Sequence, residues 1–246
     1  MEIVLLGSLI AGLAALAQAV TGFGFALVLV PLLALIVDPK LVVVISVSLG
    51  LVSKAPIILQ DWRHVELRKI APLCVAAIVG SLAGVQILLS ANPYVLKVVI
   101  GVAVIALSLP LLFEMRRPAR RERLATALVG LTSGVLNGAT SMGGPPVVLF
   151  GVNQAWGKQS FRANLCAYFV VTNVSTLLMY AATRTLTAEA LRLDLLLVPA
   201  VIVGFLVGNR LFPLVPVDRF RKGVVLLVIA TGLLSATTGL RALGIV

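Results

Sequence analysis

Long apolar runs constrain what this chain can fold into more than any other feature. Runs that approach the length of a bilayer-spanning helix, about 20 residues, occur at 41–59, 70–89, 95–113 and 195–214. Only 12% of all residues are charged, whereas a soluble domain carries about 25%. A membrane β-barrel would instead show short segments of alternating hydrophobicity. The sequence therefore predicts an all-α, polytopic helical membrane protein embedded in the lipid bilayer.

The basic residues of the chain gather in a few loops between these runs. The formal net charge is +11, which in a soluble protein would suggest a nucleic-acid partner. In a membrane protein the same clusters are typical of the cytoplasmic loops, so we expect no nucleic-acid partner. The most basic stretch, EMRRPARRER at 114–123, is predicted to be cytoplasmic. The apolar N-terminus lacks a basic leader and carries Glu2, so we expect a retained membrane segment.

An internal repeat organises the chain. The stretch AAIVGSLAG at 76–84 matches AVIVGFLVG at 200–208, sharing Ala, Ile, Val, Gly, Leu and Gly in the same order. Upstream, AVTGFGFALVLV at 19–30 aligns with GATSMGGPPVVL at 138–149, so that Thr21 meets Thr140 and Gly24 meets Gly143. We therefore divide the single membrane domain into a first repeat at 1–113, a linker at 114–123 and a second repeat at 124–246.

Each half contains about five hydrophobic segments. Their approximate ranges are 3–20, 23–37, 41–59, 70–89 and 94–113 in the first half, and 123–139, 145–155, 163–182, 194–213 and 221–240 in the second. With the linker inside, the basic loops at 61–69, 156–162 and 216–222 also fall inside. An odd number of segments per half gives the two halves opposite orientations, as in many secondary transporters. The sequence thus predicts two inverted repeats in a bacterial inner (plasma) membrane, with both termini periplasmic.

Both repeats are interrupted by glycine between their first two segments, at QAVTGFGF and at LNGATSMGGPP. We expect broken or re-entrant helices there, because non-helical backbone at membrane depth must lie within protein or beside water. Helix N-termini bind anions, so the two breaks predict a polar anion pocket between the repeats. The candidate substrate-binding residues are Gln18, Thr21, Gly22, Gly24, Lys54, Asn137, Thr140, Ser141, Gly143, Gly144 and Asn173.

Two features have competing interpretations. Glycines can simply allow close helix packing, and this suits the small-xxx-small pairs Gly80–Gly84 and Gly204–Gly208 better than the glycines of the breaks. Lys54, inside the third segment, could attract an anion, or its ammonium could snorkel to the inner interface. The sequence leaves these two roles of Lys54 equally open.

The paired breaks TGFGF and SMGGPP, each near the start of a half, resemble those of the TauE/SafE family of sulfite and organosulfonate exporters. The resemblance covers most of the chain. This chain differs from the common family pattern, which has a glycine triplet near each break. The first copy has Gly22, Gly24 and Phe25, and the second has Gly143, Gly144 and Pro145. The resemblance implies a secondary transporter that exports a small sulfur-containing anion, of the sulfite, sulfonate or sulfoacetate type.

The acidic residues all lie at the ends of the expected segments or in loops, so the sequence predicts no proton-carrying acid within a span. Transport could then be uncoupled, the proton could travel on the substrate, or sodium could bind to carbonyl and hydroxyl groups. We favour efflux driven by the membrane potential. No arrangement typical of a catalytic site is found, and we expect neither an enzyme nor a cofactor or metal. The expected partner is a small inorganic or organosulfur anion. A transporter or channel for another small anion, or for a cation such as Na⁺, is the alternative. A homo-oligomer is left open.

Overall fold

The computed structural model describes residues 2–112, 122–211, 229–230, 233 and 236–244. Within these ranges the first half of the chain forms α1 (Glu2–Thr21), α2 (Phe25–Leu33), α3 (Pro39–Asp61), the 3₁₀ turn η1 (Trp62–His64), α4 (Leu67–Ser90) and α5 (Pro93–Leu112). The second half forms α6 (Glu122–Thr140), α7 (Gly144–Asn153), α8 (Lys158–Ala182) and α9 (Ala188–Leu211). The prediction of a helical membrane protein is confirmed.

Four of the described helical stretches are long and apolar enough to cross a bilayer: Pro39–His64, Leu67–Ser90, Gln159–Ala182 and Ala188–Leu211. The expected linker at 114–123 and most of the tenth segment at 221–240 lie outside the described residues. The residues at 236–242 are helical, and Gly239 lies against Tyr94 and Val98 of α5. The inverted relation of the repeats stays a prediction.

Each break follows a helix of full length. Helix α1 has 20 residues and α6 has 19, so each is close to the about 30 Å of the hydrocarbon core. Only the second arms are short, with 9 residues in α2 and 10 in α7. Each break therefore joins a full-length helix to a short one.

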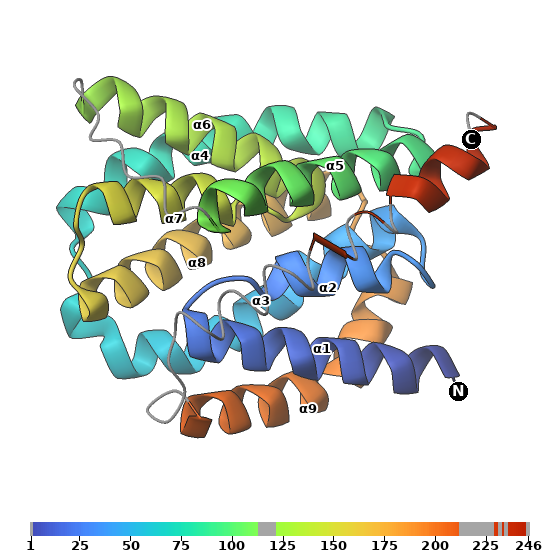
Figure 1. The fold of residues 1–246 in the computed structure, drawn as a ribbon, viewed down its shortest axis with the longest axis horizontal. Coiled ribbons are helices and arrows are strands. Elements are labelled where there is room, and N and C mark those ends of the chain that lie inside the picture. The colour runs from blue at the N-terminus through green and yellow to red at the C-terminus, as the bar shows by residue number, and fades with distance from the viewer. Residues whose placement is uncertain (1, 113–121, 212–228, 231–232, 234–235, 245–246) are drawn as a thin grey trace.

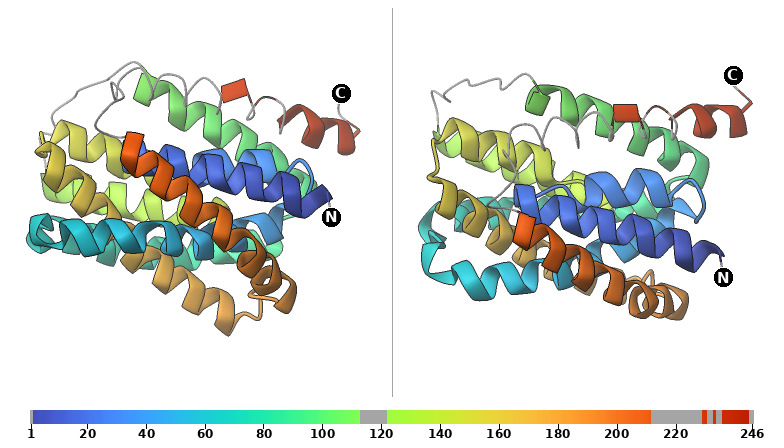
Figure 2. Two further views of the ribbon diagram at one scale, coloured as in Figure 1. Left: turned by 90° about the horizontal axis from the view of Figure 1, so that it is seen from below. Right: turned by 60° about the horizontal axis from the view of Figure 1, so that its bottom comes forward.

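The two halves of the chain are joined by packing between their helices. The first helix of each half packs along the fourth helix of the other half, so that α1 lies along α9 and α6 lies along α4. Figures 1 and 2 show α9 beside α1 from different directions. Helices α3 and α8 pack against each other between these two pairs. The two breaks are thus held on either side of a shared centre.

Glycines let the backbones of α4 and α6 touch. A Cβ atom at Gly80 would overlap the carbonyl of Leu131, and one at Gly84 would overlap the carbonyl of Val135. In the other pair, a Cβ atom at Gly204 would overlap the carbonyl of Gly12. The packing role expected for these glycines is therefore confirmed. Such close approach is typical of membrane helices, which associate without a hydrophobic driving force between them.

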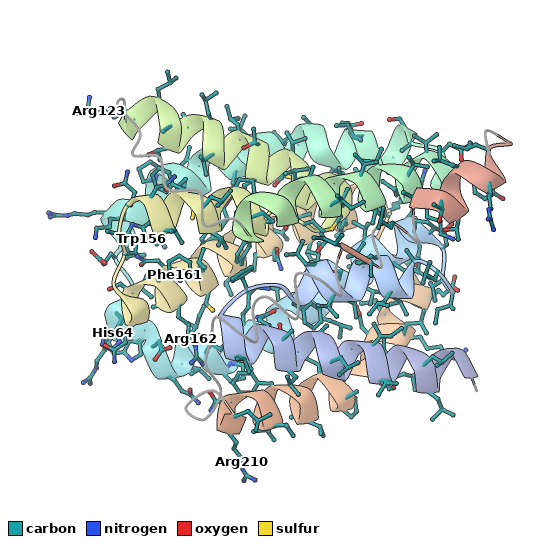
Figure 3. All side chains as sticks on the ribbon, in the orientation of Figure 1. His64, Arg123, Trp156, Phe161, Arg162 and Arg210 are labelled. Atoms are coloured by element: carbon teal, nitrogen blue, oxygen red, sulfur yellow. The ribbon has the colours of Figure 1, made fainter. Side chains whose placement is uncertain are left out.

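One end of the molecule collects the loops that the charge pattern assigns to the cytoplasm. Figure 3 places His64, Arg123, Trp156 and Arg162 toward the same end. The chain ends marked N and C in Figure 1 lie at the opposite end. We call these the basic end and the terminal end. That the basic end faces the cytoplasm stays a prediction.

Replacing Gly134 of α6 tests the backbone contact. A Cβ atom there would overlap the carbonyl of Ala77 on α4, and overpacking typically costs about 1–3 kcal/mol. This outweighs the about 1 kcal/mol by which Ala is the better helix former. We therefore expect Gly134→Ala to lower the melting temperature of the detergent-solubilised protein. Gly157→Ala is the control, because no atom lies near its Cβ position. Equal melting temperatures for the two variants would contradict the packing role.

Candidate functional site

The first break is a glycine turn that starts a short helix inside the protein. Gly22 and Gly24 have φ of 80° and 100°, values that glycine adopts at little cost. Helix α1 ends at this point and α2 begins at Phe25. The first hydrogen bond of α2 joins the Val28 N–H to the Gly24 carbonyl. The N–H groups of residues 25–27 therefore lack an acceptor within the helix.

The second break turns in a different way. Ser141, which is not glycine, has φ of 62°, and backbone strain of this kind is often found at functional sites. The Thr140 hydroxyl bonds back to the carbonyl of Leu136 at 2.7 Å. Helix α7 then begins with Gly144, Pro145 and Pro146, and proline has no N–H. The α7 N-terminus thus offers fewer free amides than the α2 N-terminus.

Both breaks line one cavity of about 40 Å³. This volume is large enough for a few water-sized groups. Helices α3 and α8 complete its wall. Figure 1 shows α2 and α7 leaving this central region toward opposite ends of the molecule. The lining residues are Gln18, Phe23, Gly24, Phe25, Ala26, Leu27, Ser46, Lys54, Asn137, Ser141, Met142, Gly144, Phe169 and Asn173.

Lys54 places a positive charge at this cavity. Its side chain is 6% exposed, so the ammonium does not snorkel to the interface. The Nζ atom donates to the Gly50 carbonyl at 2.8 Å and lies 5.5 Å from the centre of the Phe169 ring. The ion pairs found among the described residues do not include Lys54. Since an ammonium has three donors, two N–H bonds remain beyond the one given to Gly50.

Gln18 adds a neutral donor to the cavity wall. The Gln18 carbonyl oxygen accepts from the Ser53 hydroxyl at 3.1 Å, which directs the amide nitrogen away from that contact. The side chain is 1% exposed, and Nε2 has no hydrogen-bond partner within the described part of the chain. Leaving a buried donor without a partner costs about 1–3 kcal/mol. An acceptor inside the cavity would remove that cost.

Other polar side chains of the cavity hold each other. Asn137 donates to the Asn173 oxygen at 3.3 Å and to the Thr176 hydroxyl at 3.2 Å, which uses both of its N–H donors. Asn173 donates to the Val47 carbonyl at 3.2 Å, and Ser141 donates to Ser46 at 3.0 Å. These contacts tie α6, α8 and the second break to α3. The two asparagines therefore fix the wall of the cavity and supply few donors to it.

The structure brings most of the expected site residues together. Seven of them line the cavity: Gln18, Gly24, Lys54, Asn137, Ser141, Gly144 and Asn173. Gly22, Thr140 and Gly143 do not line it. Gly22 lies against Arg162, and Gly143 is packed against Ser133 and Asn137. The side chain of Thr21 lies outside the described part of the chain.

Sequence reasoning missed several residues of the wall. Ser46 of α3 carried a usable signal, because a serine stands out within an apolar run. Phe23 and Phe25 lie within the quoted TGFGF break but were given no role in the site. Phe169 had no signal, because an aromatic residue in an apolar helix usually packs against lipid or core.

Two layers separate the cavity from the basic end. Ala19, Ile57, Cys166 and Phe205 form a buried apolar cluster. Along α3, Ile57 lies between Lys54 and Asp61, and along α8, Cys166 lies between Phe169 and Arg162. Asp61 and Arg162 form an ion pair at 3.5 Å. This pair joins α3 to α8 and closes the basic side of the apolar layer.

Arg162 also connects the ion pair to two further elements. It donates to the Asn209 oxygen of α9 at 3.3 Å, and its stem lies against Gly22 of the first break. Four parts of the fold therefore meet at this arginine.

The structure corrects one expectation about acidic residues. Asp194 was expected at the end of a segment, but α9 begins at Ala188 and Asp194 lies within it. The carboxyl is buried, with 8% of the side chain exposed. Among the described residues, no three His, Cys, Asp or Glu side chains gather as a metal-ligand set.

Comparison with known proteins identifies the family. A family model described as sulfite exporter TauE/SafE matches residues 7–235. This chain belongs to the TauE/SafE family. A curated relative from Cupriavidus necator, the "Probable sulfite/organosulfonate exporter TauE", is 26% identical over 202 residues, which cover 80% of this chain and 79% of the relative. No solved structure matches the chain. The TauE/SafE resemblance expected from the breaks is confirmed.

Removing the charge of Asp61 tests the layer at the basic end of this TauE/SafE protein. Asp61→Asn should loosen the contact with Arg162 and expose Cys166, which is fully buried. In a Cys74→Ala background, we expect N-ethylmaleimide to modify Cys166 several-fold faster than without the Asp61 substitution.

Lys69→Met is the matched control for that experiment. Lys69 pairs with Glu66 at 2.6 Å within one surface turn, and its ammonium lowers the pKa of the Glu66 carboxyl. Both partners of this pair lie in the same turn, so its loss should leave the modification rate of Cys166 unchanged. Equal rates in the Asp61→Asn and Lys69→Met variants would show that the Asp61–Arg162 pair does not close the cavity.

Proposed function

We propose that this protein exports sulfite, or a closely related small sulfur oxyanion, across the cytoplasmic membrane and binds it in the cavity between the two breaks. The family to which the chain belongs is one of membrane exporters, and the named relative is a probable sulfite/organosulfonate exporter. The observation that supports the binding site most is the buried Lys54 ammonium at the cavity, without a carboxylate partner in the described residues.

The groups around Lys54 suit an anion with several oxygen atoms. The first residues of α2 line the cavity, and their free N–H groups and the helix dipole favour negative charge. Gln18 contributes a buried donor without a partner. Sulfite has three oxygens that accept hydrogen bonds, so it can engage the helix N-terminus, the amide and the ammonium together. In this arrangement α2 is the main anion-binding helix, and α7 mainly shapes the cavity.

The cavity is small and partly aromatic. Its volume of about 40 Å³ favours small sulfur anions over bulky ones. Phe23, Phe25 and Phe169 line the remaining wall and exclude water. A sodium site at this place is disfavoured, because the fixed ammonium of Lys54 would repel a cation.

Transport then requires the cavity to open to each side in turn. In the described conformation the apolar cluster and the Asp61–Arg162 pair separate it from the basic end. With that end in the cytoplasm and both termini periplasmic, the anion would enter after these layers part. An anion leaving an inside-negative cell gains about 2.3 kcal/mol per charge per 100 mV. We propose that the anion is bound and released without any chemical change to it.

Substituting Lys54 tests the proposed site. A hydrogen bond to a charged group contributes about 1.5–3 kcal/mol, and each 1.4 kcal/mol changes affinity about tenfold. We therefore expect Lys54→Met to weaken sulfite binding by about tenfold or more. Binding is measured as the rise in melting temperature of the solubilised protein with increasing sulfite.

Lys40→Met is the control, because Lys40 lies on the same helix but donates to the Leu89 carbonyl at the terminal end. It should retain the sulfite affinity of the unsubstituted protein. Sulfite binding that survives in Lys54→Met would refute the site. If sodium rather than sulfite raised the melting temperature, and raised it more in Lys54→Met, the cation alternative would be favoured.

A further inference from the structure

Asp194 is a buried acid within a helix that can span the membrane. It lies about two turns inside α9, and 8% of its side chain is exposed. Ionisable groups in such positions are costly and are usually functional. Neither the anion cavity nor the layers at the basic end include Asp194. Its role must therefore be sought in its own contacts.

The contact of Asp194 is the hydroxyl of Ser48 on α3. Asp194 Oδ2 lies at a short distance from Ser48 Oγ, whereas Oδ1 has no hydrogen-bond partner in the described part of the chain. Ser48 Oγ is also 3.2 Å from the Val44 carbonyl and 3.0 Å from the Ile45 carbonyl. A serine has one proton to donate, so these three acceptors compete for it.

That competition allows the pair to be hydrogen-bonded in two protonation states. When Asp194 is ionised, the Ser48 hydroxyl donates to the carboxylate. When a proton binds at Oδ2, the new O–H donates to Ser48 Oγ, and the serine proton turns to the Val44 or Ile45 carbonyl. The only change in composition is the gain or loss of one proton. Ser48 can thus stabilise both forms without any movement of the backbone.

The charges on the neighbouring elements do not neutralise this carboxylate. Helix α9 packs against α1 and α3, and α1 has no titratable side chain after Glu2. On α3, Lys40 is bonded to Leu89, Lys54 lies at the cavity and Asp61 pairs with Arg162. An open hollow at this end is lined by Asp38, Arg184, Glu189 and Arg192, besides Lys40. No ion pair among the described residues includes Asp194.

A hollow lined by charged residues lies beside this carboxyl. It has a volume of about 840 Å³ and lies at the terminal end, between the start of α1 and the α8–α9 connection. Its lining includes Leu193 and Leu196, which neighbour Asp194 in sequence, and Val44, one helical turn before Ser48. Asp194 is not itself part of the lining but lies next to residues that are.

Helix α3 connects this carboxyl to the anion cavity. Ser46 lines the cavity, while Ser48, two residues later, holds Asp194. Ser46 also accepts the hydrogen bond from Ser141 of the second break. The contact between α3 and α9 therefore lies within one helical turn of the wall of the anion site.

We infer that Asp194 is a proton-binding residue that couples anion transport to proton movement through the contact between α3 and α9. This inference rests on the proposed anion transport. The proton exchanges with the hollow at the terminal end. Its binding at Asp194 replaces a buried negative charge by a neutral acid and rearranges the hydrogen bond of Ser48.

Transport by Asp194→Asn in proteoliposomes tests the coupling. The substrate should be methanesulfonate as well as sulfite, because a sulfonate stays ionised near neutral pH and cannot carry the proton itself. The unsubstituted protein should move protons with the anion and should respond to an imposed pH gradient. Asp194→Asn should lose both effects but retain anion exchange at equal pH, because the amide imitates the neutral acid.

Glu189→Gln is the matched control, because it removes an exposed acid of the same helix that lines the hollow. It should keep the proton coupling of the unsubstituted protein. Proton-coupled methanesulfonate transport that survives in Asp194→Asn would overturn the inference. So would a pH dependence confined to sulfite when methanesulfonate is also transported, since the proton would then travel on the substrate.

Infrared difference spectroscopy separates this inference from the proposed function. A protonated Asp194 should give the carbonyl stretch of a carboxylic acid, and this band should be missing in Asp194→Asn. If the unsubstituted protein carries no sulfur anion, the proposed function fails, and the band still decides whether Asp194 binds a proton. If the band does not depend on Asp194 at any pH, the inference fails while anion transport can stand.

Discussion

Unpaired backbone at membrane depth is the constraint on which the rest of this structure depends. The chain stops a helix after α1 and again after α6, and the freed amides must lie within protein or beside water. The fold meets this demand by surrounding both breaks with α3 and α8 and by leaving a cavity between them. Glycine contacts between α4 and α6, and between α1 and α9, bring the backbones close enough to enclose it.

Much of this architecture could be predicted because its signals are local. Apolar runs mark the spans, glycine and proline mark the breaks, and small residues spaced four apart mark the close crossings. Lys54 shows where such reasoning ends. Its position in an apolar run indicated either an anion site or snorkelling, and only packing decides between them. The ammonium is bonded to Gly50 and lies near Phe169, a residue far away in sequence.

The parts that could not be predicted depend on contacts between distant segments. Asn137 was expected to bind substrate, but its donors are taken by Asn173 and Thr176 of α8. Asp194 was placed at a segment end because charged residues precede it, which lowers the local hydropathy. The helix nevertheless begins six residues earlier, at Ala188, because helix formation does not require apolar residues. Burial of Asp194 then follows from packing against α3, which hydropathy does not describe.

Helix α3 contacts both of the buried acidic or basic side chains of the described structure. Lys54 belongs to it, and Asp194 reaches it through Ser48. The positive group faces the cavity, while the acid lies nearer the terminal end, so they do not neutralise each other. An ammonium kept unpaired leaves the cavity attractive to an anion. A carboxyl kept unpaired leaves a place for a proton. Pairing the two directly would remove both properties. Under the two proposals made above, keeping Lys54 and Asp194 apart lets an anion and a proton each act on α3.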